Sequence, residues 1–207
     1  MPTESDIPQT IYVATGVRSD KREPLRTVFL DRDGVINRKM PEGEYVSSWE
    51  RFALLPGVQA AIARLNEVGL RVIVVTNQRG VALGKYTVAD VEAVHSNLQN
   101  ALAAEGAHVD GFYFCPHDKR ACDCRKPLPG LFHQARKDFP EITAESSVIV
   151  GDSLSDVEFG KGLGMRTVFV EGDAGSRKPG WEKAGELAET CFPDLPKAVD
   201  HLLEGAL

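Results

Sequence analysis

The sequence lacks any long hydrophobic run and any surplus of positive charge. None of its apolar stretches approaches the ~20 residues of a membrane-spanning helix, so we expect no membrane partner. The first ten residues, MPTESDIPQT, lack the basic and apolar regions of a signal peptide, and we therefore expect a cytoplasmic protein. The net charge of −6 argues against a nucleic-acid partner, because such partners bind basic surfaces.

Cysteine is also scarce, yet its few occurrences are clustered. Cys115, Cys122 and Cys124 lie close together, whereas Cys191 lies in the tail. In a cytoplasmic chain this clustering favours a metal site over a disulfide. His117 completes the pattern C-x-H-x₄-C-x-C, and three thiolates with one imidazole can bind zinc tetrahedrally. The alternatives are a disulfide pair or buried free cysteines.

Short apolar runs alternate with helical patterns over most of the chain. Strands are expected at residues 27–30, 71–75, 111–114, 147–150 and 166–170. Helices are expected from Pro56-Gly57 to Gly69, from Thr87 to about Glu105, at 130–138, near 154–162, and in the tail, where Pro193 and Pro196 mark a break. This alternation predicts an α/β fold with a Rossmann-like, doubly wound, mainly parallel sheet and helices on both faces.

The domain organisation follows from the same patterns. Residues 26–207 are expected to form a single domain, which includes a zinc loop at 115–124. Residues 1–25 show no sustained periodicity, and we interpret them as a mobile N-terminal extension. No apolar stripe is left without a partner, so we expect a monomer.

The helix expected after residue 87 turns four apolar residues and one histidine to the same side. Val88, Val91, Leu98 and Leu102 are expected to face the core, and His95 falls on that face. We interpret His95 as a core or boundary histidine rather than a ligand.

Polar residues follow three of the expected strands. Asp31 and Asp33 come after the first strand, Thr76 after the second, and Asp152 after a later one. Ligands of parallel sheets bind beyond the carboxyl ends of the strands, so these groups are expected to converge on one site. The alternative for Asp31-Arg32-Asp33-Gly34 is an ordinary solvated turn.

Such a site suits a phosphate ester. Asp31 and Asp152 offer hard oxygen ligands for Mg²⁺, which would offset the repulsion between carboxylate and phosphate. One carboxylate can attack phosphorus, and Asp33 can protonate the leaving oxygen and then activate water. Thr76 and Lys126 can stabilise the transferred group. Cations in the expected loops also favour a small anionic substrate, although loops are often simply polar: Arg32, Arg38, Lys39, Arg79, Lys85, Lys119, Arg120, Arg125 and Lys126.

Together these motifs resemble the haloacid-dehalogenase-type phosphatases. The shared pattern is Asp31-x-Asp33-Gly34, Thr76 at the end of an apolar strand, Lys126, and Gly151-Asp152 followed by Asp156. The resemblance implies that Asp31 is the nucleophile, that Asp33 is the acid/base, and that Thr76 and Lys126 stabilise the phosphoryl group. It also implies that Mg²⁺ is held by Asp31, Asp152 and the backbone carbonyl of Asp33. Asp156 would steady Lys126 or the metal, or else be a surface carboxylate.

Members of this family often carry an inserted cap domain. Here only about twenty residues separate Asp33 from the helix at Pro56-Gly57, too few for a cap, so loops must choose the substrate. Asp33 also argues against dehalogenase activity, because that branch lacks this aspartate.

The zinc loop narrows the resemblance to a capless, zinc-containing branch with two main activities. The stretches FLDRDGVIN, VVTNQRGVALGKYT, FYFCPH and CDCRKPLPG, within about residues 26–170, look closest to enzymes that remove the 7-phosphate of D-glycero-D-manno-heptose 1,7-bisphosphate. That reaction proceeds through an aspartyl-phosphate and serves the synthesis of nucleotide-activated heptose, for lipopolysaccharide or another glycan. The residues implied to line the sugar bisphosphate site are Gly43, Tyr45, Asn77, Gln78, Arg79, Arg125 and Lys126.

Two alternatives stay open. The short gap between His117 and Cys122 is closer to the branch that hydrolyses histidinol phosphate. A zinc-ordered binding module without activity is the alternative from another class, although it would not need Asp31, Asp33, Lys126 or Asp152.

Overall fold

The strands assemble into one parallel sheet. The computed structural model describes residues 23–172, 175, 177 and 179–204, so most of the expected N-terminal extension lies outside the described residues. Within them, the sheet has the order β3-β2-β1-β4-β5-β6, and all neighbouring strands are parallel. The strands are β1 Thr27–Leu30, β2 Arg71–Asn77, β3 Gly111–Cys115, β4 Ser147–Gly151, β5 Arg166–Val170 and β6 Thr190–Phe192.

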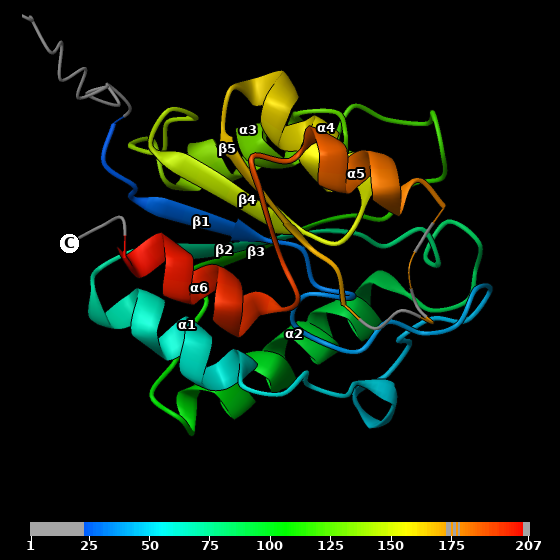
Figure 1. The fold of residues 1–207 in the computed structure, drawn as a ribbon. Helices are drawn as coiled ribbons and strands as arrows, with labels where there is room; N and C mark the ends of the chain where they lie inside the picture. The colour runs from blue at the N-terminus through cyan, green and yellow to red at the C-terminus, as the bar shows by residue number, and fades with distance from the viewer. Residues whose placement is uncertain (1–22, 173–174, 176, 178, 205–207) are drawn as a thin grey trace, which may run out of the picture.

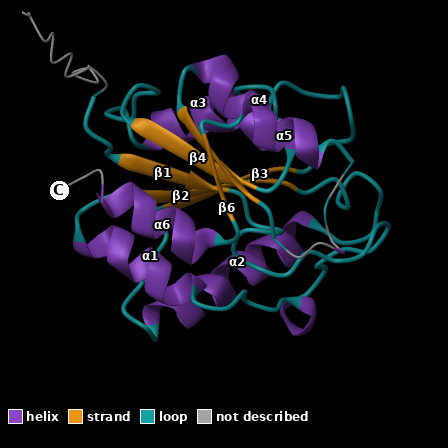
Figure 2. Ribbon diagram, viewed as in Figure 1, coloured by secondary structure: helices purple, strands orange, loops and turns teal. Residues whose placement is uncertain are grey.

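Helices cover both faces of this sheet (Figures 1 and 2). One face is covered by α1 Val58–Glu67, α2 Val88–Ala103 and α6 Leu195–Glu204; the other by α3 Gly130–Asp138, α4 Leu154–Leu163 and α5 Trp181–Leu187. Strand residues alternate between two cores: Val28 and Leu30 pack on the α1 side, and Phe29 on the α3 side. The predicted doubly wound fold is therefore confirmed.

The strand order reverses at β1, and this places the functional edge. β1 pairs with β2 on one side and β4 on the other, with Leu30 in register with both Val74 and Val150. The backbone N–H of Asp31 continues the ladder by donating to the Val150 carbonyl at 3.0 Å. Residues that follow these strands therefore share the edge at a topological switch point, where open α/β sheets bind ligands.

No inserted domain occurs between residues 23 and 172. The segment from Asp33 to α1 contains one short 3₁₀ helix, η1 Trp49–Arg51, and otherwise loop. The absence of a cap domain agrees with the sequence prediction. Among the described helices, none has the length and apolar character required to cross a bilayer.

One detail of the predicted helices and strands is confirmed, and others differ for identifiable reasons. Thr87 does cap α2, through a capping box with Asp90. The prediction that Val88 faces the core is wrong, since Val88 is 40% exposed; as the first helical residue it precedes the buried stripe that begins at Val91. β6 was not predicted, and Pro196 lies in the first turn of α6, where a missing N–H costs no hydrogen bond.

Candidate active site

Three carboxylates meet at the switch point. Asp31 follows β1, Asp152 follows β4, and Asp156 lies in the first turn of α4; one oxygen of each lies within 4.8 Å of the others. All three are almost fully buried. Gly34 allows the loop after β1 to lie close to Asp152, because its φ is +107° and a Cβ there would lie 2.1 Å from Asp152 Oδ2. Such close like charges require a cation.

Lys126 supplies a cation at this centre. Its Nζ lies 2.9 Å from Asp31 Oδ1 and 2.6 Å from Asp156 Oδ1, and it donates to the Val75 carbonyl at 2.6 Å. Burial would lower the pKa of Lys126, but the charges of Asp156 and Asp31 outweigh it and raise the pKa, so the ammonium stays charged. Asp156 therefore steadies Lys126, and the reading as a surface carboxylate is wrong, since only 1% of Asp156 is exposed.

Asn77 fixes the backbone that carries this lysine. Its Nδ2 donates to the Lys126 carbonyl at 3.1 Å, and its Oδ1 accepts from the Lys126 N–H at 3.0 Å. Both ends of the amide are thus used within the protein. Asn77, which the sequence analysis predicts to line the substrate site, anchors the loop after the Cys/His cluster.

Asp33 is held by three donors that converge on its carboxylate. Arg32 Nη2 lies 3.1 and 3.0 Å from its two oxygens, and Asn37 and Gln78 each donate at 2.9 Å. Burial would raise the pKa of Asp33, but the charge of Arg32 and the hydrogen bonds from Asn37 and Gln78 together lower it. The side chain keeps 24% of its surface exposed, which leaves it accessible from the site.

Arg32 does not belong to a basic surface, contrary to the sequence interpretation. It is 1% exposed and contacts His95, whose Nε2 lies 3.3 Å from Arg32 Nη1. His95 stacks on Phe112 with ring centroids 4.7 Å apart, which confirms it as a core histidine. Burial first, and then the charge of Arg32, lowers the pKa of His95 to about 3, so its ring is neutral. The helical pattern predicted the buried position of His95, but nothing in the sequence indicated that Arg32 is its partner.

The remaining predicted substrate residues divide into three groups. Gln78 is 2% exposed and bonds to Asp33 and Thr76, so it lies beneath the site. Gly43 is exposed on its loop. Tyr45 is half-buried, and its ring packs against that of Tyr86 with the ring centroids 5.8 Å apart.

Two arginines complete this set. Arg79 Nε pairs with Asp118 at 2.5 Å, which ties the end of β2 to the Cys/His loop. Arg125 Nη1 is buried and has no hydrogen-bond partner among the described residues. An unpaired buried guanidinium nitrogen is costly, so it suits an anion that completes it.

The Cys/His loop forms a compact donor cluster. Cys115, His117, Cys122 and Cys124 place one donor atom each within 4.8 Å of one another. Adjacent donors lie 3.3 to 3.7 Å apart, and all three cysteines are free thiols. Tetrahedral zinc with bonds of about 2.3 Å needs donor separations of roughly 3.8 Å, so the four groups fit that ion closely.

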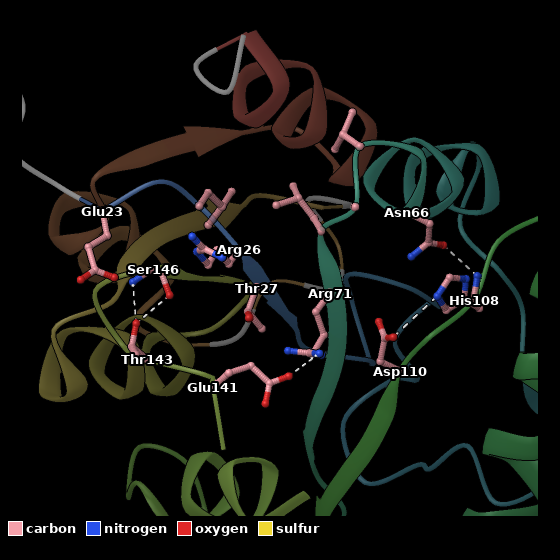
Figure 3. Close-up of a pocket in the computed structure, with 14 residues that line it drawn as sticks. Glu23, Arg26, Thr27, Asn66, Arg71, His108, Asp110, Glu141, Thr143 and Ser146 are labelled. Atoms are coloured by element: carbon pink, nitrogen blue, oxygen red, sulfur yellow. Dashed lines mark hydrogen bonds and ion pairs between the residues drawn. The ribbon is translucent and has the colours of Figure 1, made fainter. Parts of the chain in front are cut away.

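A hollow of about 640 Å³ opens at the opposite edge of the sheet (Figure 3). Thr27 and Arg71, the first residues of β1 and β2, line it, and Arg71 pairs with Glu141 at 2.6 Å. It contains none of the predicted site residues. A smaller hollow of about 330 Å³ borders the carboxylate edge, where it is lined by Gly34, Arg38 and Lys39 among others. Lys39 also pairs with Asp152.

Comparison with known proteins agrees with this geometry. A family model described as HAD-hydrolase-like matches residues 123–198. D-glycero-alpha-D-manno-heptose-1,7-bisphosphate 7-phosphatase of Mycobacterium bovis is 40% identical over 169 residues, which cover 81% of this chain and 86% of that protein. This chain belongs to the HAD-like heptose bisphosphate phosphatase family. Within the family, the D-glycero-beta-D-manno-heptose-1,7-bisphosphate 7-phosphatase of Escherichia coli K12 is 34% identical and covers 83% of this chain and 92% of its own length.

A solved structure of the family shows the same fold. The D,D-heptose 1,7-bisphosphate phosphatase of B. bronchiseptica, complexed with magnesium and phosphate, matches with a TM-score of 0.78 and 33% identity. The match covers 88% of this chain and 100% of that one. The resemblance to HAD phosphatases drawn from the motifs is therefore confirmed.

Proposed function

We propose that this phosphatase removes the 7-phosphate of D-glycero-D-manno-heptose 1,7-bisphosphate, for the synthesis of an activated heptose. One observation carries the proposal: Asp31 lies in a buried centre with Asp152 and the Lys126–Asp156 pair, which is an arrangement for phosphoryl transfer. The substrate comes from the relatives, which act on this sugar bisphosphate.

Magnesium is the metal proposed for the carboxylate edge. Asp31, Asp152 and the backbone carbonyl of Asp33 would hold it, since they are hard oxygen donors that follow the adjacent strands β1 and β4. When bound, the ion supplies positive charge that offsets the repulsion between phosphate and carboxylate. The family structure with magnesium and phosphate supports this choice.

The protein's own groups then divide hydrolysis into two displacements. A carboxylate oxygen of Asp31 attacks phosphorus, an aspartyl-phosphate forms, and the bond to the sugar oxygen breaks. Asp33 gives a proton to that oxygen, then takes one from the water that releases phosphate. The charge of Lys126 and the hydroxyl of Thr76 stabilise the transferred group, which carries negative charge throughout.

The second phosphate is proposed to bind at the arginine side of the site. Arg125 offers a buried nitrogen for which the described residues provide no hydrogen-bond partner. Asp118, which pairs with Arg79, also lies near Arg125, because the hydrogen bond from Arg79 and then the charges of both arginines lower its pKa. Arg38 and Lys39 line the smaller hollow beside Gly34, where Lys39 pairs with Asp152. Gly43 and Tyr45 would contact the sugar from the loop before α1.

Zinc is the metal proposed for Cys115, His117, Cys122 and Cys124, in a structural role. It would order a loop with little hydrophobic core and fix Arg125 and Lys126, which follow the last ligand. Because three reduced thiols are needed, the proposal includes a cytoplasmic location. We also propose that the protein is a monomer.

The test is phosphate release with Mg²⁺ from both anomers of heptose 1,7-bisphosphate, beside histidinol phosphate. We expect the bisphosphate to be preferred at least about a hundredfold in kcat/KM, or about 2.7 kcal/mol of transition-state free energy. Asp31→Asn should lower turnover by at least about 10³-fold while it keeps the fold. Preference for histidinol phosphate would overturn the substrate, and activity retained by Asp31→Asn would overturn the mechanism.

A further inference from the structure

Gln78 joins two residues of the catalytic edge through a single amide. Its Nε2 donates to Asp33 Oδ2 at 2.9 Å and to Thr76 Oγ1 at 2.9 Å. Both donors of the amide are thereby used. Because the Thr76 hydroxyl accepts from Gln78, its own proton is left to point toward a phosphoryl oxygen. One side chain thus sets both the carboxylate of Asp33 and the donor direction of Thr76.

Tyr86 holds the other end of that amide. The Asp33 carboxylate only accepts, so Nε2 faces it, and the Tyr86 hydroxyl donates to Gln78 Oε1 at 2.7 Å, which keeps the amide in this position. A reversed amide would place its oxygen against the Asp33 carboxylate and its NH₂ against the tyrosine hydroxyl. Burial raises the pKa of Tyr86 to about 12, so the hydroxyl keeps its proton and remains a donor.

Tyr86 is itself held in place from two sides. Its ring lies directly over Gly80, where a Cβ would come within 2.1 Å of the ring and so displace it. On the other side it packs against Tyr45, in the loop that is proposed to contact the sugar. Only 7% of Tyr86 is exposed, and its hydroxyl is directed to Gln78.

We propose that Tyr86 is a positioning residue for phosphoryl transfer, which acts through Gln78 on Asp33 and Thr76. The inference rests on the proposed phosphatase function, but not on the identity of the sugar. It also moves Gln78 from substrate binding to positioning, because all its polar atoms are used within the protein. The role predicts a loss in proton delivery to the leaving group more than a loss in binding.

The test compares Tyr86→Phe with Tyr113→Phe, a matched control whose hydroxyl donates to Asp138 far from the site. Each is assayed with an alkyl phosphate that the wild type cleaves and with p-nitrophenyl phosphate, whose leaving group needs little protonation. We expect Tyr86→Phe to lower kcat about tenfold for the alkyl ester and less than about threefold for the aryl ester, with KM within about twofold. Tyr113→Phe should match the wild type.

A second variant keeps the inference falsifiable if Tyr86→Phe folds poorly. Gln78→Met removes the amide, and adding Tyr86→Phe to it should lower kcat no further, because the two residues act in series. Additive losses, equal losses for both esters, or no loss would overturn the positioning role. If the wild type cleaves an alkyl ester but not the heptose bisphosphate, the proposed substrate fails while this test still applies.

Discussion

Lys126 and Asp156 form an ion pair that is almost completely buried, with Nζ 2.6 Å from Oδ1. Asp156 also accepts from the backbone N–H and hydroxyl of Ser153 at the start of α4. The carboxylate therefore joins the cap of a helix to the catalytic cation. This link means that the charge beside Asp31 depends on a residue that does not take part in the chemistry.

Asp156→Asn is expected to weaken both stability and turnover. It keeps an oxygen for Ser153 but removes the negative charge that faces Lys126, and breaking a buried ion pair costs about 3–5 kcal/mol. We expect Tm to fall by roughly 6–20 °C for a chain of this size, and kcat by about tenfold or more. Thermal unfolding and phosphate release measure the two effects. Asp138→Asn, on the surface of α3, serves as the control, and an unchanged Tm for Asp156→Asn would contradict the role of the pair.

Removal of one proposed zinc ligand is expected to destabilise the loop that carries Lys126. Cys124→Ser should lose the metal and lower Tm by roughly 6–12 °C, equivalent to about 3 kcal/mol. Cys191→Ser is the matched control, because Cys191 is exposed and lies outside the cluster. Elemental analysis and thermal unfolding provide the measurement. If wild-type protein produced in medium that contains zinc is purified without bound zinc, the proposed site is ruled out.

His95 is expected to make stability depend on pH. The folded protein lowers the pKa of His95 from 6.5 to about 3, so below pH 6.5 the unfolded chain binds a proton that the folded chain does not. The free energy of unfolding should therefore fall by up to about 1.4 kcal/mol per pH unit as pH is lowered from 6 toward 4.

His95→Gln keeps an acceptor for Arg32 but does not titrate. It should flatten the pH dependence of urea unfolding over that range, whereas His133→Gln, at an exposed position, should leave it unchanged. Parallel curves for the wild type and His95→Gln would show that His95 is not the group responsible.

Arg125→Ala is expected to discriminate between a bisphosphate and a monophosphate. Loss of one charge-assisted contact should raise KM for heptose 1,7-bisphosphate about tenfold, with little change for heptose 7-phosphate. Arg136→Ala, on the surface of α3, is the control. An equal change in KM for both substrates would place Arg125 away from the second phosphate.

The sequence predicted the elements whose pattern is local. The apolar runs of β1 and β5 and the helix α3 have the expected bounds, because burial on both faces or a regular helical stripe dictates each residue. β6 escaped prediction since it has three residues, of which Cys191 is exposed. Motifs fix the positions of Asp31, Asp152 and Lys126 at strand ends and near the Cys/His loop, and the structure brings these residues together as expected.

The residues that position this chemistry could not be found in the same way. Arg32 contacts His95, which lies 63 residues away in the sequence, and Gln78 donates to Asp33, which lies 45 residues away. The helical stripe placed His95 on the buried face, but no local pattern distinguishes a buried arginine or tyrosine from a surface one or names its partner. His95 comes from α2 and Gln78 from the segment after β2, so these groups meet Arg32 and Asp33 only in the folded chain.

Asn77 forms hydrogen bonds with the backbone of residue 126 and not with its side chain. The lysine side chain can therefore be removed without loss of the contacts that hold this loop. In Lys126→Ala the main chain should stay where it is, with Asp31 and Asp156 facing a hole shaped for an ammonium group. Added alkylamines such as propylamine should then restore part of the lost turnover, in proportion to their concentration. An amine in solution would then replace the ammonium group of Lys126. Comparison of amines of different size would show which shape fits the space left by the lysine side chain.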